Sequence, residues 1–324
     1  MTFWEEAPVT ELLGIRIYSF GLYCAIGAFC AMAAVCVLTR AVGMKKGTGL
    51  LLSCACFIGG ILVSRLAFCL LRLVIAEGFP LRAWFRVSSG GWSLFGMITG
   101  VFAAAWVCAK ICHENSRKFL DTAACALPLA IAAERFAERM FGDFDISRQL
   151  ACGGFPEGTF LAVQKGTSGD ISFLATYLLA AACAILLFII LVFFLTRPNR
   201  EDGDAWILFM ILCGAGGVML ESLRYDSYLE YSFVRFQQVM AAGMLATGVI
   251  TAGIRNLGMR KGLFRAALIS VPVAIALCIG IEFALDRTDM NHYLLYTAML
   301  FILAVPASLG ILLLRNRKKG TETL

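Results

Sequence analysis

The stretch from Glu134 to Arg139 combines acidic and basic side chains at spacings that could do chemistry. Arg135 and Glu138 are three residues apart, and Arg135 and Arg139 are four apart, so in a helix each pair shares a face. Guanidinium groups on one face can bind a phosphate group, because each presents a rigid fork of N–H donors. The same residues also suit ion pairing where a helix meets the aqueous interface. The stretch therefore predicts either a phosphate site or an ion-pair cluster.

A second acidic and basic pair, Glu221 and Arg224, lies at the end of another apolar run. Its i,i+3 spacing lets the two side chains meet, and a carboxylate this close to hydrocarbon is costly unless it is paired. Arg65 differs from both, because it lies inside the apolar run 49–74 rather than at its edge. An arginine at such a depth is expected to pair within a helical bundle. We therefore expect polar clusters at or near one boundary of a membrane.

Small residues dominate the segment from Ser89 to Gly100, which includes Gly90, Gly91 and Gly96. Glycine lets two backbones, or a backbone and a ligand headgroup, approach closely. Two interpretations stay open for this segment. It is either a binding loop or a place where helices simply pack closely.

Membrane-spanning helices are the elements that must position these residues. Apolar residues make up 60% of the 324 residues and charged residues only 15%, whereas about a quarter of a soluble domain is charged. The apolar runs are continuous and long enough to cross about 30 Å of hydrocarbon as helices. We predict an all-α, polytopic membrane bundle of about nine transmembrane helices. The predicted spans are 17–38, 49–74, 91–112, 119–136, 173–195, 205–222, 236–254, 266–285 and 293–314.

The distribution of Lys and Arg predicts how the chain lies in the membrane. Basic residues gather in short connections at 40–46, 110–118, 197–200, 255–265 and 315–319, which are expected to be cytoplasmic. The amino terminus then lies outside and the carboxyl terminus in the cytoplasm of a bacterial inner membrane. The first apolar run follows an acidic stretch and is not expected to be a removable signal peptide. The exterior segment 137–172, which contains Asp143, has a length that is usually functional or disordered.

Charge and cysteine content exclude two other classes of site. The formal net charge of +6 comes from dispersed basic residues, so no nucleic-acid partner is expected. All of the 13 cysteines except Cys152 fall within or at the edge of an apolar run, where cysteine behaves as a small hydrophobe. Cys108, Cys112 and His113 lack a nearby fourth donor, so no metal site is predicted.

Several segments in collinear order carry a family resemblance: residues 21–23, 64–68, 89–100, 121–135 with Gly142 and Asp143, 221–226, and Gln237. Over roughly residues 14–254 the chain resembles the bacterial prolipoprotein diacylglyceryl transferases. Members of that family typically have seven spans in the same orientation. The resemblance implies a transferase-like seven-helix membrane domain at 1–254, with two additional transmembrane helices and a basic tail at 255–324.

The resemblance also implies an activity. Such an enzyme moves the diacylglyceryl group of phosphatidylglycerol onto the thiol of a prolipoprotein lipobox cysteine and releases glycerol phosphate, with no cofactor or metal required. The phospholipid, the lipobox peptide and the membrane are then the partners. The catalytic residues implied by position are Arg135, Glu221 and Arg224, and proximity to Arg135 makes Glu138 a candidate base. The expected substrate-binding residues are Arg65, Ser89, Gly90, Gly91, Gly96, Arg139, Asp143 and Gln237.

Some positions depart from the family pattern. Phe95 replaces a histidine, Glu138 an asparagine, Phe20 a tyrosine, and Gly217 the second phosphate-binding arginine, while the segment 171–177 lacks a clear counterpart of another family motif. Loss of one preorganised donor can cost about 10² to 10³ in rate. A catalytically degenerate relative that binds lipid or lipoprotein without transfer is therefore the alternative. A solute transporter is a weaker third reading, because no convincing internal repeat is found.

Overall fold

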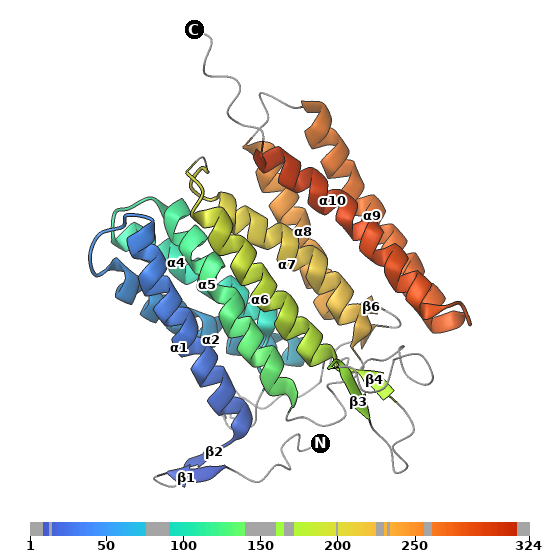
Figure 1. Ribbon diagram of the computed structural model, residues 1–324, viewed down its shortest axis with the longest axis horizontal. Helices are drawn as coiled ribbons and strands as arrows, with labels where there is room; N and C mark the ends of the chain where they lie inside the picture. Colours follow the sequence, from blue (N-terminus) through green and yellow to red (C-terminus); the bar gives the residue numbers. More distant parts are fainter. Residues whose placement is uncertain are drawn as a thin grey trace. The chain divides into compact units, whose positions relative to one another are not determined.

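A computed structural model describes residues 9–12, 15–75, 91–139, 160–164, 172–198, 200–224, 230–231, 234–255 and 261–315, and Figure 1 shows how their helices and strands are arranged. The helices are α1 (Ser19–Ala41), α2 (Thr48–Ile75), α4 (Leu94–Ile111), α5 (Ser116–Ala137), α6 (Thr176–Leu195), α7 (Asp204–Leu223), α8 (Phe236–Ile254), α9 (Lys261–Arg287) and α10 (His292–Arg315). Short antiparallel hairpins pair β1 (Thr10–Leu12) with β2 (Ile15–Ile17), β3 (Ala162–Gln164) with β4 (Ser172–Leu174), and β5 (Glu230–Tyr231) with β6 (Val234–Arg235).

The prediction of an all-α membrane bundle is confirmed. Within the described ranges, a helix lies over each predicted span, and eight of these helices are long and apolar enough to cross a membrane. The helix outside that set is α5, which carries Asp121, Glu134 and Arg135 and is therefore less apolar than its neighbours. Most of α5 is buried within the protein, and protein contacts rather than lipid surround the side chains of Asp121 and Arg135.

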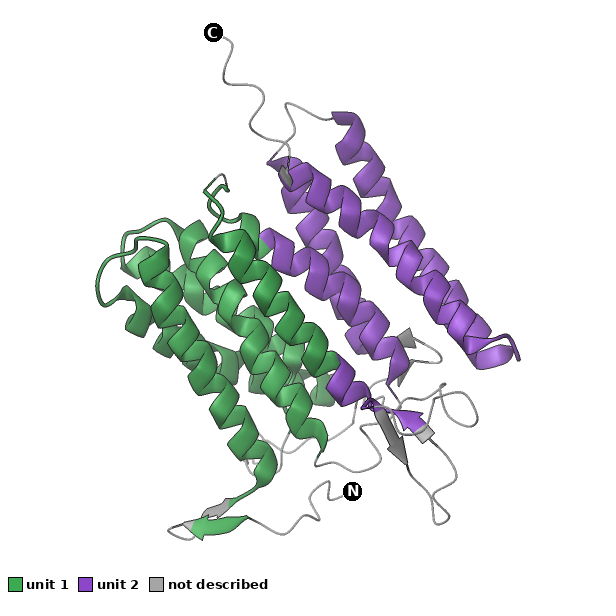
Figure 2. Ribbon diagram, viewed as in Figure 1, with its two compact units in different colours: residues 1–142, 180–206 green, residues 143–179, 207–324 purple. Residues whose placement is uncertain are grey.

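The chain forms two compact units, drawn in different colours in Figure 2. Unit 1 comprises residues 1–142 and 180–206, and unit 2 comprises residues 143–179 and 207–324. The sequence predicts a different division, after residue 254, because the resemblance to the family ends there. That domain boundary stays a prediction.

Close backbone approach holds the helices of unit 1 together. Helix α1 packs on α5, and α2 packs on α4. A Cβ atom on Gly100 of α4 would lie 2.2 Å from the carbonyl oxygen of Gly59 on α2, and one on Gly27 of α1 would lie 2.2 Å from Cβ of Ala133 on α5. Only glycine permits such approaches, so these positions fix how the four helices meet.

Asp121 fixes one end of unit 1. Its fully buried carboxylate accepts hydrogen bonds from Arg200 Nη1 at 2.9 Å and from the backbone N–H groups of Gly203 at 2.7 Å and Trp206 at 2.9 Å. Arg200 Nε in turn donates to the carbonyl oxygen of Leu195 at 2.6 Å. One carboxylate therefore neutralises a partly buried arginine and satisfies N–H groups around the start of α7, which have no partner within the helix.

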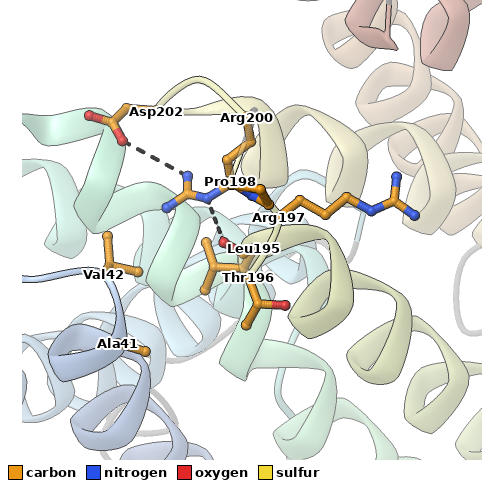
Figure 3. Close-up of a pocket in the computed structure, with 8 residues that line it drawn as sticks. All are labelled: Ala41, Val42, Leu195, Thr196, Arg197, Pro198, Arg200 and Asp202. Carbon is orange, nitrogen blue, oxygen red and sulfur yellow. Dashed lines mark hydrogen bonds and ion pairs between the residues drawn. The ribbon is translucent and has the colours of Figure 1, made fainter.

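An open pocket of about 360 Å³ lies beside this ion pair (Figure 3). Ala41 and Val42 line one side, and residues between Leu195 and Asp202 line the other. The pocket lies near the end of α5 that carries Asp121. Arg135 is fourteen residues further along the same helix, roughly 20 Å away at 1.5 Å per residue, so the pocket is separate from the arginine cluster described below.

Unit 2 has a close-packed centre of its own. A Cβ atom on Gly214 of α7 would lie 2.4 Å from the backbone nitrogen of Leu245 on α8, so these helices meet backbone to backbone. An apolar cluster then joins the end of α7 to β4, α9 and α10; its buried members are Leu174, Leu223, Leu285, Leu295 and Tyr296. The last two helices are thus packed into unit 2 rather than attached loosely to it.

Candidate functional site

The C-terminal end of α5 places Arg135 inside unit 1, where 6% of the residue is exposed. Its Nη1 donates to Glu138 Oε1 at 2.8 Å, and its Nε lies 3.5 Å from Glu134 Oε2. Glu138 is 8% exposed. Phe136 meets the ring of Tyr23 on α1 edge to face, with 5.5 Å between ring centroids, which fixes this turn against α1. The expected pairing of Arg135 with Glu138 is present, and it is buried rather than exposed to solvent.

Arg139 lies in a different environment. Its side chain is exposed, whereas that of Arg135 is buried. The two guanidinium groups therefore do not share one buried position, and a role for Arg139 in binding phosphate stays a proposal.

Arg65 joins α2 to the segment that precedes α4. Its Nη1 donates to the carbonyl oxygen of Gly91 at 2.7 Å. The guanidinium carbon lies 5.7 Å from the ring centre of Phe68 and 5.6 Å from that of Trp92, distances typical of cation–π contacts. The expected pairing of Arg65 within the bundle is therefore present.

A pair of serines holds the same junction. Ser64 Oγ donates to the carbonyl oxygen of Ser93 at 2.9 Å and accepts from the Ser93 N–H at 3.0 Å. The Ser93 hydroxyl accepts from the Gly96 N–H at 3.1 Å and so caps α4. These bonds fix the start of α4 beside Ser64, and so they set the position of α4 along the axis of α2.

The glycines of this segment make the junction possible. Gly91 has a φ of +85°, and a Cβ atom there would lie 2.3 Å from the ring of Phe68. A Cβ atom on Gly96 would lie 2.7 Å from Cβ of Ala67. Close helix packing is therefore present at Gly96, while a ligand-binding role for either glycine stays a proposal.

The end of α7 carries the second charged cluster, in unit 2. Arg224 Nε lies 4.0 Å from Glu221 Oε2, and both residues are buried. Arg235, also buried, donates from Nη1 to the main-chain carbonyl oxygen of Glu221. Two arginines therefore lie at the C-terminal end of a helix, where the unsatisfied carbonyl groups and the helix dipole favour positive charge.

Gln238 makes buried contacts at the start of α8, next to the predicted Gln237, whose role in substrate binding stays a prediction. Gln238 Oε1 accepts from the backbone N–H of Arg235 at 3.1 Å, and Gln238 Nε2 donates to Glu282 Oε1 at 2.7 Å. Gln237 is only partly buried. Sequence reasoning missed Arg235, Gln238 and Glu282. A signal for Glu282 was present, because it lies inside the predicted span 266–285, where a carboxylate is costly unless paired.

The remaining predicted positions are placed as follows. Ser89, Gly90 and Asp143 lie outside the described residues. Gly217 lies on α7, one turn before Glu221, and a Cβ atom there would be 3.0 Å from Cβ of Ala241 on α8. Helix α8 therefore occupies the space into which a larger side chain at position 217 would extend. Among the described residues, no three His, Cys, Asp or Glu side chains are arranged to hold a metal ion.

The fold and these clusters define a polytopic helical membrane protein with buried arginine and carboxylate groups at helix ends. Such groups can hold an anionic headgroup and move a proton beside it. The sequence model of the prolipoprotein diacylglyceryl transferase family matches residues 8–254. The chain belongs to that family, and the resemblance noted above is confirmed.

Two relatives carry the name phosphatidylglycerol–prolipoprotein diacylglyceryl transferase. The protein of Fervidobacterium nodosum is 26% identical over 188 residues, which cover 56% of this chain and 62% of that protein. The protein of Clostridioides difficile is 24% identical over 220 residues, which cover 67% of this chain and 83% of that protein. The match thus spans less than two thirds of the first relative. Family and helices together make the chain a multi-pass bacterial membrane protein.

Proposed function

We propose that the chain transfers the diacylglyceryl group of phosphatidylglycerol to the cysteine thiol of a prolipoprotein. The observation that carries this proposal is the buried Arg135–Glu138 pair at the position of the family's essential arginine. The names of both relatives contain the two proposed substrates, phosphatidylglycerol and a prolipoprotein. A lipobox peptide is the acceptor segment that the resemblance implies.

The proposed reaction is a displacement at carbon. The cysteine sulfur attacks the glycerol carbon that carries the phosphate ester, so a C–S bond forms as the C–O bond breaks. Glycerol phosphate leaves with the electron pair of that bond. The thiol proton passes to a carboxylate, for which Glu138 and Glu221 are the candidates, and from there to solvent. A buried arginine, for which Arg135 and Arg224 are the candidates, stabilises the charge that grows on the phosphate oxygen.

Orientation and localisation follow from the basic connections. We place the amino terminus outside and the carboxyl terminus in the cytoplasm of the bacterial inner membrane. Phospholipid then reaches the protein from the bilayer, and the acceptor peptide reaches it from the exterior. The proposed chemistry uses no metal or other cofactor, so activity is expected to persist in EDTA.

A second candidate is a relative that binds lipid or lipoprotein without transfer. Phe20, Phe95 and Gly217 favour it, because they replace family residues with groups that neither move protons nor bind phosphate. An assay with a lipobox peptide and vesicles of one defined lipid headgroup distinguishes the two candidate functions. Release of glycerol phosphate from phosphatidylglycerol vesicles, without release of phosphoethanolamine from phosphatidylethanolamine vesicles, supports the transferase. Saturable binding of a lipobox peptide with no release from either lipid supports the binding protein.

A further inference from the structure

Helices α9 and α10 follow the part of the chain that matches the family. They carry polar side chains that bond at or near the turn that holds Glu221 and Arg224. Helix α9 begins at Lys261 and helix α10 at His292, whereas the family match ends at residue 254. Glu282 of α9 is only 4% exposed, and Tyr296 of α10 is also buried. Figure 1 shows these helices in orange and red, and Figure 2 shows that they belong to the same compact unit as most of α7.

A chain of hydrogen bonds runs from Glu282 to the end of α7. Glu282 Oε1 accepts from Gln238 Nε2 at 2.7 Å, and Gln238 Oε1 accepts from the backbone N–H of Arg235 at 3.1 Å. The Arg235 guanidinium then donates to the carbonyl oxygen of Glu221. Each of these four residues is buried, so water competes little for the bonds.

Tyr296 makes a second, independent connection. Its hydroxyl donates to the carbonyl oxygen of Ser222 at 3.3 Å. Helix α10 therefore contacts the Ser222 carbonyl group directly, and α9 is connected to the preceding carbonyl group, that of Glu221, through Gln238 and Arg235. Carbonyl groups at this end of a helix have no partner within the helix, so outside donors decide how well the turn is held.

Attachment of the helices does not require these polar contacts. Leu285 and Leu295 already pack with Leu223 in the apolar cluster of unit 2. A buried carboxyl group in such surroundings is costly, and an apolar side chain would pack α9 against α8 without that cost. A buried Glu282 therefore points to a requirement for its acceptor oxygen.

We infer that Glu282 and Tyr296 are positioning residues, which hold Glu221 and Arg224 in the arrangement that the reaction needs. This inference rests on the proposed function. It assigns a role in the site to the helices beyond the family match, and it makes α9 and α10 part of the catalytic unit.

Substitutions at position 282 test the chain of bonds. Glu282→Gln keeps a side-chain oxygen that can accept from Gln238, whereas Glu282→Leu removes it at similar size. We expect Glu282→Leu to lower kcat roughly tenfold or more, with KM for phosphatidylglycerol within about threefold of wild type, and Glu282→Gln to restore most of the activity. Gln238→Leu should give a similar loss, and the double variant Glu282→Leu with Gln238→Leu should lose little more than either. Wild-type kcat in Glu282→Leu, or losses that multiply in the double variant, would overturn the inference.

Tyrosine substitutions give a matched test of the second connection. Tyr296→Phe removes one hydroxyl and is expected to lower kcat roughly two- to tenfold. Tyr293→Phe is the control, because Tyr293 lies on the same helix with an exposed side chain. Equal activity of the two variants would contradict a positioning role for Tyr296.

Hydrogen exchange separates this inference from the proposed function. Amides of residues 219–224 should exchange faster in Glu282→Leu than in the wild-type protein and in Glu282→Gln, whether or not the protein is active. Absence of transfer by the wild-type protein would refute the proposed function alone. Unchanged exchange in this peptide in Glu282→Leu would refute the positioning role.

Discussion

The Arg135 guanidinium and the Glu138 carboxylate lie 2.8 Å apart at the end of α5, and both are shielded from water. Burial weakens screening by salt and solvent, so each group strongly influences the other. A phosphate group that binds Arg135 must therefore compete with Glu138 or share the arginine with it. The same contact puts a carboxylate beside an arginine, which is the arrangement that the proposed displacement uses.

Glu138→Gln tests whether this carboxylate moves a proton. The amide keeps an oxygen for Arg135 but removes the charge, so phosphatidylglycerol should bind at least as well while kcat falls roughly 10²-fold. Initial rates at several mole fractions of the lipid separate the two effects. If kcat is unchanged, the base is another group, and Glu221 becomes the remaining candidate.

Arg139→Ala tests whether an exposed arginine contributes to lipid binding. Because the side chain is exposed, its attraction to an anionic headgroup is screened. We expect KM for phosphatidylglycerol to rise a few-fold with little change in kcat, and the rise to shrink at high salt. Kinetics equal to wild type at low salt would remove Arg139 from the site.

Gly100→Ala tests the backbone contact that sets α4 on α2. The added methyl group would lie 2.2 Å from the Gly59 carbonyl oxygen, so the helices must separate, and we expect a loss of about 1–3 kcal/mol in the free energy of unfolding. Gly243→Ala on α8 is the control, because nothing lies within 4 Å of its added Cβ. Denaturant unfolding in detergent micelles measures both variants. Equal stability of the two would show that the contact is looser than described.

Asp121→Ala tests the buried ion pair at the other end of α5. It takes from Arg200, whose side chain is 11% exposed, the carboxylate at 2.9 Å, and it removes the acceptor for the N–H groups of Gly203 and Trp206 around the start of α7. A loss of about 3–5 kcal/mol is therefore expected. Asp202→Ala is the matched control. Its side chain is 31% exposed and lies 3.9 Å from Arg200, so less than about 1 kcal/mol should be lost. Similar melting temperatures for the two variants would argue against an anchoring role for Asp121.

The positions of the helices were predictable from sequence, because an apolar run of membrane length has few alternatives to a helix. The predicted span 236–254 coincides with α8, for example. Helix α5 was found although it is the least apolar, because its charged residues lie near its ends. The pairing of Arg135 with Glu138 was also predictable, since i,i+3 spacing fixes proximity within one helix.

Contacts between helices were harder to predict from the sequence. The adjacent residues Gln237 and Gln238 point about 100° apart on α8, and only the packing of α8 against α9 decides which one meets Glu282. The bond between Ser64 and Ser93 depends on where α4 begins along α2, and the sequence holds no local signal for that register. Glu282 itself could have been selected as an acid within a span, but its partner could not.

Transfer by the purified protein tests the central claim most directly. Wild-type protein and the Arg135→Ala variant would be incubated with phosphatidylglycerol vesicles and a lipobox peptide, and the mass of the peptide would be followed with glycerol phosphate release. We predict that the peptide gains the mass of one diacylglyceryl group per glycerol phosphate released, and that Arg135→Ala lowers the rate about 10²- to 10³-fold. A peptide of unchanged mass with the wild-type protein, despite saturable lipid binding, would contradict the transferase assignment and identify the chain as a binding relative.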